Sequence, residues 1–373
     1  MLDKLPISPK TQKILEKALD EPISCEDANY LINVNGSDLF ALIATADYLR
    51  KEIVGDNVTF INNCNINFTN VCTVRCGFCA FARDLGDHDA YIFSDEEIIK
   101  KGSEAVEQGA REFCVMGGVL PDAGIEYYED LLKLLKSEFP HVAIHGFSPT
   151  MIYEAALKSE MTIDDSFKVL KKAGLDTLPG TAAEILTDRS RDLVCPSKVN
   201  VPMWIDIIKA SHNNGIPSSA TIMYGHVEKI EERVEHLDIL RKIQTETKGF
   251  TELIPMTFMH EHSPIYNAGE KNLGATGTQD LKLYAVSRLM FRDLIPNIQV
   301  SWVKMGFRFA QVSLTAGAND LGGTLGGDEL SEASGAPDGV DASIEQLSNI
   351  VKDLCRNPIE RNSKYSEFYP IDY

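Results

Sequence analysis

Three cysteines in one short segment have the spacing of an iron–sulfur site. Cys72, Cys76 and Cys79 follow the pattern C-x3-C-x2-C. Thiolates are the soft ligands that iron–sulfur centres prefer, and so tight a loop can hold three corners of one cubane cluster. The iron left open can chelate the amino and carboxylate groups of S-adenosylmethionine (SAM). An electron from the cluster then breaks the S–C5′ bond and gives a 5′-deoxyadenosyl radical. The spacing therefore predicts two cofactors, a 4Fe-4S cluster and SAM.

Two other metal sites are alternatives for this cysteine loop. Zinc sites usually show paired C-x2-C or histidine-containing spacings with four ligands, and the segment has no second pair. A fully ligated cluster would need Cys64, Cys114 or Cys195 as a fourth ligand, which their spacing does not suggest. Both alternatives stay open. Cys25 and Cys355 are interpreted as ordinary thiols.

The residues around the cysteine loop form an alternating pattern of strands and helices. After short helices, the chain from Val58 onward alternates β-rich runs with amphipathic stretches, which indicates parallel strands joined by crossover helices. The predicted strands are Val58–Phe68, Glu112–Met116, Val142–His145, Leu175–Leu178, Ser219–Met223, Glu252–Pro255, Ile298–Trp302 and, less strongly, Thr315–Ala318. The predicted helices are Thr11–Leu19, Cys25–Ile32, Asp38–Glu52, Glu96–Gln108, Glu126–Phe139, Asp164–Lys172, Met203–Asn213, Glu228–Thr245 and Asp280–Asp293.

This pattern predicts the α/β class and a TIM-type (β/α)8 barrel with a helical segment before it. We expect an N-terminal helical segment at 1–56, a barrel at 57–325 and a C-terminal helical extension at 326–373 that packs on the barrel. The leading helices are expected to cap the barrel. Loops after barrel strands meet at one end, so the side chains that follow the predicted strands should share a mouth.

Two features near the cysteines suit the binding of SAM. Gly117 and Gly118 follow the second predicted strand, where small residues let backbone carbonyls approach the methionine amino group. Phe78 lies inside the cysteine loop and is a candidate to flank the adenine. The alternatives are a tight turn before Pro121 and simple packing of Phe78 on the barrel rim.

Further along the chain, polar residues are candidates for the ribose and the carboxylate of SAM. Glu184 is predicted to accept hydrogen bonds from the ribose hydroxyls. Arg189 or Arg191 is predicted to pair with the methionine carboxylate in a bidentate fork. For each arginine, an ion pair on the surface is the alternative.

Four histidines at predicted strand ends are candidates for proton transfer or substrate binding. Histidine changes charge near neutral pH, and a structural hydrogen bond is the alternative role for each of them. The candidate catalytic residues are His145, His226, His260 and His262. Trp302 is interpreted as a packing residue rather than a radical relay.

Composition excludes several classes of partner. The chain has 373 residues and a net charge of −19, whereas proteins that grip nucleic acid usually carry a basic surface. Its apolar runs fall short of the roughly 20 residues that a membrane helix needs, and the first residues lack the apolar centre of a secretory signal. We therefore expect a cytoplasmic protein that binds neither nucleic acid nor membrane.

Several motifs together resemble the radical SAM group that builds deazaflavins and futalosine-derived menaquinone. The resemblance covers about Leu39 to Arg361, and within the group it is strongest to the tyrosine-using subunits of F0 synthase. The motifs are the cysteine loop with its lead-in Asn65–Asn70, His145–Pro149, Pro179–Leu186, Ala220–Glu228, His260–Tyr266, Ser301–Lys304 and Ala316–Thr324.

The resemblance implies a transferase reaction on the route to coenzyme F420. The radical would abstract hydrogen from the amino group of L-tyrosine, and Cα–Cβ scission would release 2-iminoacetate and a 4-hydroxybenzyl radical. That radical would add to C5 of 5-amino-6-(D-ribitylamino)uracil. The resemblance also implies two protein partners, the second radical SAM subunit of F0 synthase and a reductant. An aminofutalosine synthase or dehypoxanthine futalosine cyclase of menaquinone synthesis is the alternative.

The resemblance also implies roles for individual residues. It implies that Cys72, Cys76 and Cys79 are the cluster ligands and that Glu184 contacts SAM. Relatives often have histidine two positions after the paired glycines, where this chain has Leu120. A neutral uracil with a ribityl chain needs hydrogen-bonding groups more than charge. The candidate substrate-binding residues are Ser301, Asn319 and Asp320.

Overall fold

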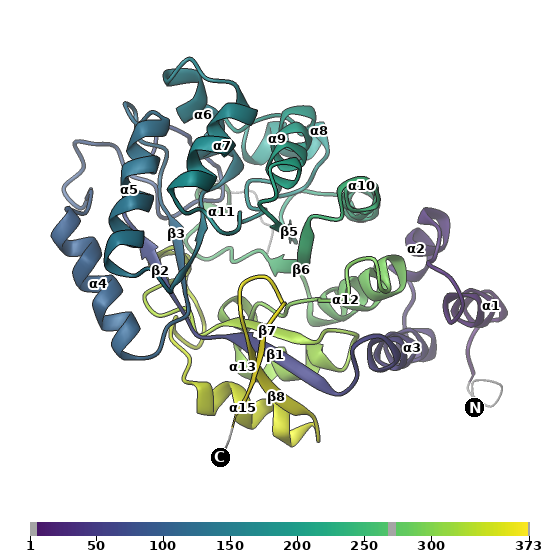
Figure 1. Cartoon of the computed structure of the whole chain (residues 1–373). Helices are drawn as coiled ribbons and strands as arrows, with labels where there is room; N and C mark the ends of the chain where they lie inside the picture. The colour runs from purple at the N-terminus through teal and green to yellow at the C-terminus, as the bar shows by residue number, and fades with distance from the viewer. Residues whose placement is uncertain (1–5, 268–273, 372–373) are drawn as a thin grey trace.

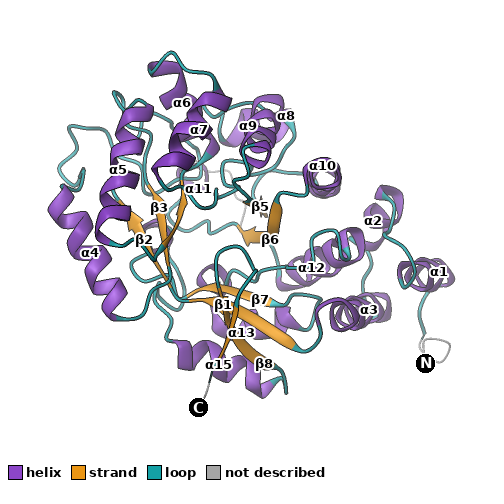
Figure 2. Ribbon diagram, in the orientation of Figure 1, coloured by secondary structure: helices purple, strands orange, loops and turns teal. Residues whose placement is uncertain are grey.

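The computed structural model describes residues 6–267 and 274–371; the ends of the two predicted terminal segments, 1–5 and 372–373, lie outside the described residues. The chain forms a parallel barrel surrounded by helices (Figure 1, Figure 2). The barrel strands are β1 (Asn57–Ile61), β2 (Asn63–Asn67), β3 (Glu112–Met116), β4 (Ala143–Gly146), β5 (Ser218–Tyr224), β6 (Phe250–Thr257) and β7 (Asp320–Gly323). No helix within the described ranges is long and apolar enough to cross a membrane.

Strand pairing closes the barrel. β2, β3 and β4 pair in parallel, as do β5 and β6. Single bridges at Thr177 and Leu178 connect β4 to β5, and bridges at Ile298 and Gln299 connect β6 to β7. β7 then pairs with β1, which continues into β2 after Asn62. The predicted TIM-type barrel is therefore confirmed.

Several predicted strands differ in detail. The predicted strand Val58–Phe68 is interrupted at Asn62, and Leu175–Leu178 and Ile298–Trp302 keep only isolated bridges. The predicted strand at Thr315–Ala318 is wrong, because the chain pairs at Asp320–Gly323 instead. Residues 315–317 form a turn that ends a helix, with Gly317 at a φ of 99°. A left-handed residue at that point stops the chain from extending earlier.

The barrel helices fall close to their predicted positions. They are α4 (Asp95–Glu107), α5 (Ile125–Glu138), α7 (Ile163–Ala173), α9 (Val201–Asn213), α10 (Ile230–Thr247) and α12 (Gly277–Phe291). Four other helices of the described residues were not predicted: α6 (Pro149–Lys158), α8 (Asp188–Val194), α11 (Pro264–Asn267) and α13 (Trp302–Leu314). A further helix, α15 (Ile344–Asp353), lies in the predicted C-terminal helical extension. The sequence does contain a helix-start signal for α6, because Ser148 caps the helix and Pro149 stands in its first turn.

The leading helices lie beside the barrel and do not cap it. They are α1 (Pro9–Ala18), α2 (Cys25–Leu31) and α3 (Ser37–Val54). α3 packs on α12, and α2 packs on α10 and α12, at the right of Figure 1. No residue of these three helices lines the cavities described below. The expectation that they shield the mouth is therefore not met.

The C-terminal segment is more than the helical extension that the sequence predicted. Besides α14 (Glu329–Ala333) and α15 it contains β8 (Asn357–Arg361) and β9 (Phe368–Pro370). β8 pairs in parallel with β1, and β9 pairs with β8. β1 meets β7 on one edge, so its other edge needs a partner for its backbone groups, which β8 supplies. The buried ion pair of Arg361 with Asp320 holds this segment to the barrel.

Candidate active site

A pocket at the carboxyl ends of the barrel strands, called here the upper pocket, collects most of the predicted SAM site. Its walls come from the cysteine loop, the β3 end, the loop after Leu178, β5, β6 and α13. Its exposed surface is mostly apolar. The predicted residues that line it are Cys72, Cys76, Phe78, Cys79, Gly117, Gly118 and Glu184.

A second cavity, called here the lower cavity, adjoins the upper pocket inside the barrel. The two share Met116, Thr181, Met256, Lys304 and Leu330 in their walls. Most of the residues that line the lower cavity are polar. The predicted residues that line the lower cavity are His145 and Ser301.

Strand β2 supplies much of that polar wall. Asn63, Asn65 and Asn67 alternate with apolar neighbours, so their side chains share the inner face of the barrel. Asn65 Oδ1 and Asn67 Oδ1 are buried and have no hydrogen-bond partner within the described residues, and the same holds for Glu252 Oε2 on β6. Buried polar atoms are rarely left unpaired. The lower cavity is therefore prepared for a ligand rich in hydrogen-bonding groups.

Backbone hydrogen bonds anchor the cysteine loop on three sides. Cys72 N donates to Arg83 O, Thr73 N to Val119 O at 2.9 Å, and Gly77 N to Val194 O at 2.7 Å. Val119 N donates to Cys72 Sγ at 3.3 Å. This bond ties the Cys72 side chain to the backbone that follows the paired glycines.

The three cysteine side chains of the loop line the same pocket. Among the described side chains, no three of the His, Cys, Asp and Glu type converge closely enough to hold one metal ion. In a cubane each thiolate binds a different iron, so its ligands surround a larger centre than a single ion. Three thiols around one pocket thus fit a 4Fe-4S cluster. Cys64, Cys114 and Cys195, the possible fourth ligands, do not line the upper pocket.

The paired glycines make room for the cysteine loop. A Cβ atom on Gly118 would lie 2.0 Å from Val71 O and 2.8 Å from Cys72 Cβ. A Cβ on Gly117 would lie 3.0 Å from Thr69 O. These contacts join the end of β3 to the backbone that carries the first cysteine. The glycines therefore determine how deeply Cys72 lies in the upper pocket.

Glu184 forms a buried ion pair that the sequence did not reveal. Lys198 Nζ binds Glu184 Oε1 and lies 4.9 Å from the centroid of the Phe78 ring. Burial by itself would raise the pKa of Glu184, but Lys198 holds it below its usual value. Glu184 is thus an ionised acceptor on the pocket wall, and its backbone has a φ of 46°. No motif around Lys198 indicated this role.

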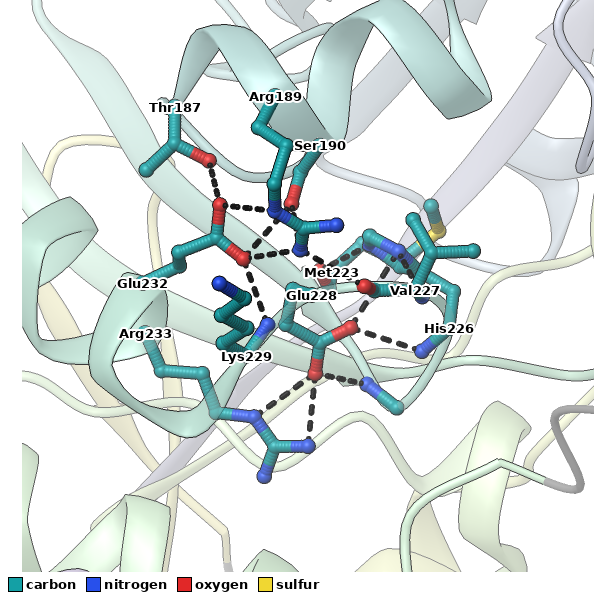
Figure 3. Close-up of polar contacts among 11 residues, drawn as sticks. Thr187, Arg189, Ser190, Met223, His226, Val227, Glu228, Lys229, Glu232 and Arg233 are labelled. Carbon is teal, nitrogen blue, oxygen red and sulfur yellow. Dashed lines mark hydrogen bonds and ion pairs between the residues drawn. The ribbon is translucent and has the colours of Figure 1, made fainter.

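The two candidate arginines do not reach the upper pocket. Arg189 binds Glu232, which also accepts from Thr187 Oγ1 and from the backbone of Lys229 (Figure 3). Arg191 donates to the carbonyl oxygens of Ala182, Ala183 and Val199. Both side chains therefore order the loop that carries Glu184.

The histidines separate into two groups. His226 is buried, and its ring bonds Met223 O through Nε2 and Val227 N through Nδ1 (Figure 3). His262 Nδ1 contacts Ala333 O. In contrast, His145 faces the lower cavity, where Nδ1 lies 2.7 Å from Thr177 Oγ1. His260 lines a side pocket near the mouth and packs against Tyr266.

The remaining predicted residues have internal partners. Asn319 binds Arg288 and the backbone of Ile298, and Asp320 binds Arg361. Neither of them lines the upper pocket or the lower cavity. Trp302 stacks on Phe307 and donates Nε1–H to Gly323 O, as expected of a packing residue.

A buried neutral histidine should make this site sensitive to acid. His236 Nδ1 accepts from Leu186 N and Nε2 contacts Thr221 O, so it joins the Glu184 loop to β5. Burial lowers the pKa of His236 to about 3. The stability that neutral His236 adds to the folded protein is fully present above the unfolded-state pKa near 6.5. It is lost as the pH falls towards the folded-state pKa.

We expect His236→Gln to reduce this acid sensitivity. Between about pH 7.5 and about pH 5, the wild type should lose about 2 kcal/mol more unfolding free energy than the variant. Urea unfolding of both proteins at the two pH values measures the difference. An equal loss in both proteins would show that His236 does not titrate on unfolding.

Comparisons with known proteins agree with this arrangement. Residues 66–240 match the radical SAM superfamily, and residues 247–371 match the CofH/MqnC C-terminal region. The chain is similar to methylornithine synthase (PylB), with a TM-score of 0.67 and 18% identity over 94% of this chain and 97% of that one. It is also similar to the hydrogenase maturase HydG from Carboxydothermus hydrogenoformans, with a TM-score of 0.72 and 15% identity over 96% of this chain and 81% of that one. These likenesses support the barrel fold.

Curated relatives are much closer in sequence. A 5-amino-6-(D-ribitylamino)uracil--L-tyrosine 4-hydroxyphenyl transferase of Methanothermobacter thermautotrophicus is 52% identical over 98% of this chain and 100% of its own length. One of Methanococcus maripaludis strain C6 is 45% identical over 88% of this chain and 92% of its own length. With this identity over nearly the whole chain, the protein belongs to the radical SAM family of 5-amino-6-(D-ribitylamino)uracil--L-tyrosine 4-hydroxyphenyl transferases.

Proposed function

We propose that this protein is a radical SAM transferase that couples the 4-hydroxybenzyl group of L-tyrosine to 5-amino-6-(D-ribitylamino)uracil. The reaction releases 2-iminoacetate and belongs to F0 synthesis. The observation that carries the proposal is that a mostly apolar pocket lined by three thiols adjoins a cavity lined mainly by polar residues. The names of the relatives support the two substrates.

In this proposal the upper pocket holds the cofactors. Cys72, Cys76 and Cys79 would hold a 4Fe-4S cluster, and SAM would bind beside it. When bound, this pair supplies a one-electron cleavage of SAM and thus an organic radical. Phe78 flanks the adenine, and Glu184, kept ionised by Lys198, accepts from the ribose hydroxyls.

The lower cavity is assigned to the diaminouracil. Its ring and ribityl chain carry many donors and acceptors, which match the unpaired atoms of Asn65, Asn67 and Glu252. Ser301 lies on the same wall. The interior of the barrel separates the reacting groups from bulk water, which protects a radical from side reactions.

Product analysis tests the function. Reconstituted protein is incubated without oxygen with SAM, dithionite, tyrosine and the diaminouracil, and mass spectrometry should detect 5′-deoxyadenosine and a coupled adduct. A parallel arm with a futalosine-type substrate tests menaquinone synthesis, which the relatives' names do not favour. Turnover in that arm alone would overturn the proposal. Metal analysis should find iron rather than zinc.

Glu252 provides a test of the lower cavity. Burial raises the pKa of Glu252 to about 7, with Arg361 acting in the opposite direction and Asp320 and Glu112 adding to the rise. We expect Glu252→Gln to raise the KM for the diaminouracil about 10-fold, since a hydrogen bond to a charged acceptor is replaced. The KM for tyrosine should not change. The pH dependence of the diaminouracil KM near neutrality should also flatten in the variant.

The control for this variant is Glu26→Gln, the same change on exposed helix α2. Its kinetic constants should equal those of the wild type. If Glu252→Gln leaves the KM for the diaminouracil unchanged, the pyrimidine does not bind at this wall.

The proposal includes two protein partners and a compartment. One partner is a reductant that supplies the electron, and the other is the second radical SAM subunit of F0 synthase, which takes up the adduct. A reducing cytoplasm suits the free cysteines of the chain. Omitting each partner in turn from a complete F0 assay tests both roles.

A further inference from the structure

Lys304 lies at the junction of the cavities without an ionic partner. It stands in the first turn of α13, and it lines the upper pocket, the lower cavity and the side pocket near His260. Among the residues that the structure describes, no hydrogen bond or ion pair involves its Nζ atom. Other cations around these cavities are engaged: Lys198 binds Glu184 and Arg361 binds Asp320.

The surroundings of Lys304 leave its charge uncompensated. Burial lowers the pKa of Lys304, while the more distant charges of Asp328 and Glu184 oppose this shift. Glu184 already binds Lys198, and Asp328 Oδ1 accepts from Ser331 N at the start of α14. Lys304 is half-buried, and a partly desolvated cation without an ion-pair partner is stabilised by an anionic ligand.

The backbone that carries Lys304 is held firmly. Lys304 N donates to Ser301 O at 3.1 Å, and the neighbouring Trp302 is fixed by its bond to Gly323 O and by its stacking on Phe307. Gly306 interrupts the helix just beyond, with a φ of 77°. The first turn of α13 is therefore an anchored unit, which suits a residue that positions a ligand.

We propose that Lys304 binds the α-carboxylate of the amino-acid substrate and so holds tyrosine between the two chambers. This inference rests on the proposed function. The diaminouracil is neutral, so it offers no anion to this lysine. SAM also has a carboxylate, but in the proposed function that group would be held by the cluster at the cysteine loop. Among the described residues, Lys304 is the one lysine or arginine that lines both chambers. Tyrosine must lie there, between SAM and the pyrimidine.

The first arm of the test uses the reconstituted wild-type enzyme and two ligands. L-Tyrosinamide keeps the shape of tyrosine but lacks the negative charge. As an inhibitor of adduct formation it should bind about 10- to 100-fold more weakly than tyrosine, the range expected when a charge-assisted hydrogen bond is lost. Equal binding of the amide and the acid would overturn the proposal, and this arm requires no variant to fold.

The second arm uses Lys304→Met, with Lys172→Met on the exposed face of α7 as control. Lys304→Met should raise the KM for tyrosine about 10- to 100-fold and should bind tyrosine and its amide alike. The Kd for SAM, from equilibrium dialysis, should stay the same. A raised Kd for SAM with an unchanged KM for tyrosine would assign the lysine to the SAM carboxylate and overturn the proposal.

The outcomes separate this inference from the proposed function. A wild-type enzyme that forms no adduct from tyrosine contradicts both. Wild-type adduct formation together with an unchanged KM for tyrosine in Lys304→Met contradicts only the role of Lys304.

Discussion

Replacement of Cys76 by alanine is expected to abolish the cleavage of SAM while the barrel stays folded. Burial raises the pKa of the Cys76 thiol to about 12, so without a cluster this residue is a protonated thiol and not a free nucleophile. In the proposed function its role is that of a cluster ligand. Removing it should reduce the rate of 5′-deoxyadenosine formation by more than the about 10- to 100-fold that loss of an outer-shell partner costs.

The structure explains why folding should survive this change. Cys76 lies in a loop outside the barrel strands, and the backbone bonds of its neighbours remain when its side chain is shortened. The unfolding free energy of the apoprotein should change by about 1 kcal/mol or less. Cys355→Ala, at an exposed thiol, is the matched control and should keep full activity. SAM cleavage by Cys76→Ala at the wild-type rate would exclude Cys76 as a ligand.

Gly118→Ala is expected to have the second largest effect. The new Cβ would lie 2.0 Å from Val71 O, which is backbone and cannot rotate away. The cysteine loop must therefore move outward, and Cys72 moves with it. A displacement of about 1 Å at a reacting centre can cost about 100-fold in rate. We expect a loss of that size in 5′-deoxyadenosine formation, together with a lower iron content after reconstitution.

The chain contains a suitable control for this variant. Gly86 is exposed in the segment after the cysteines, and a Cβ there would meet no atom within 4 Å. Gly86→Ala should therefore match the wild type in iron content and in rate. Normal iron content and normal rate in Gly118→Ala would show that the loop tolerates the displacement, and that the glycine is not required for its position.

The mouth of the barrel shows how distant segments cooperate at one site. Val194 O, at the end of α8, accepts from Gly77 N, and Ile265 N in α11 donates to Gly77 O at 2.8 Å. Segments nearly two hundred residues apart thus hold the centre of the cysteine loop. Among the described residues, the cysteine loop and α14 contribute to the wall of the upper pocket, and the leading helices do not.

Local pattern alone determined the barrel and the position of the cysteine loop. Strand and helix periodicity depends on near neighbours, and a strand followed by a loop places that loop at the barrel mouth. For the same reason the three cysteines, Phe78, Gly117, Gly118 and Glu184 were predicted together, and the structure brings them to one pocket. The inward-facing asparagines of β2 were not predicted, although alternate residues of a strand point to the same face of a sheet.

Tertiary structure alone decided which polar side chains are free to act. Arg189, Arg191, His226, Asn319 and Asp320 have suitable chemistry, but partners from distant segments occupy them. Glu252 and Lys304 line the lower cavity instead. Whether a charged group is paired depends on contacts between residues far apart in the chain, and residue type and spacing carry no record of those contacts. The same holds for β8, which joins β1 only because the closed barrel leaves an edge of β1 for it.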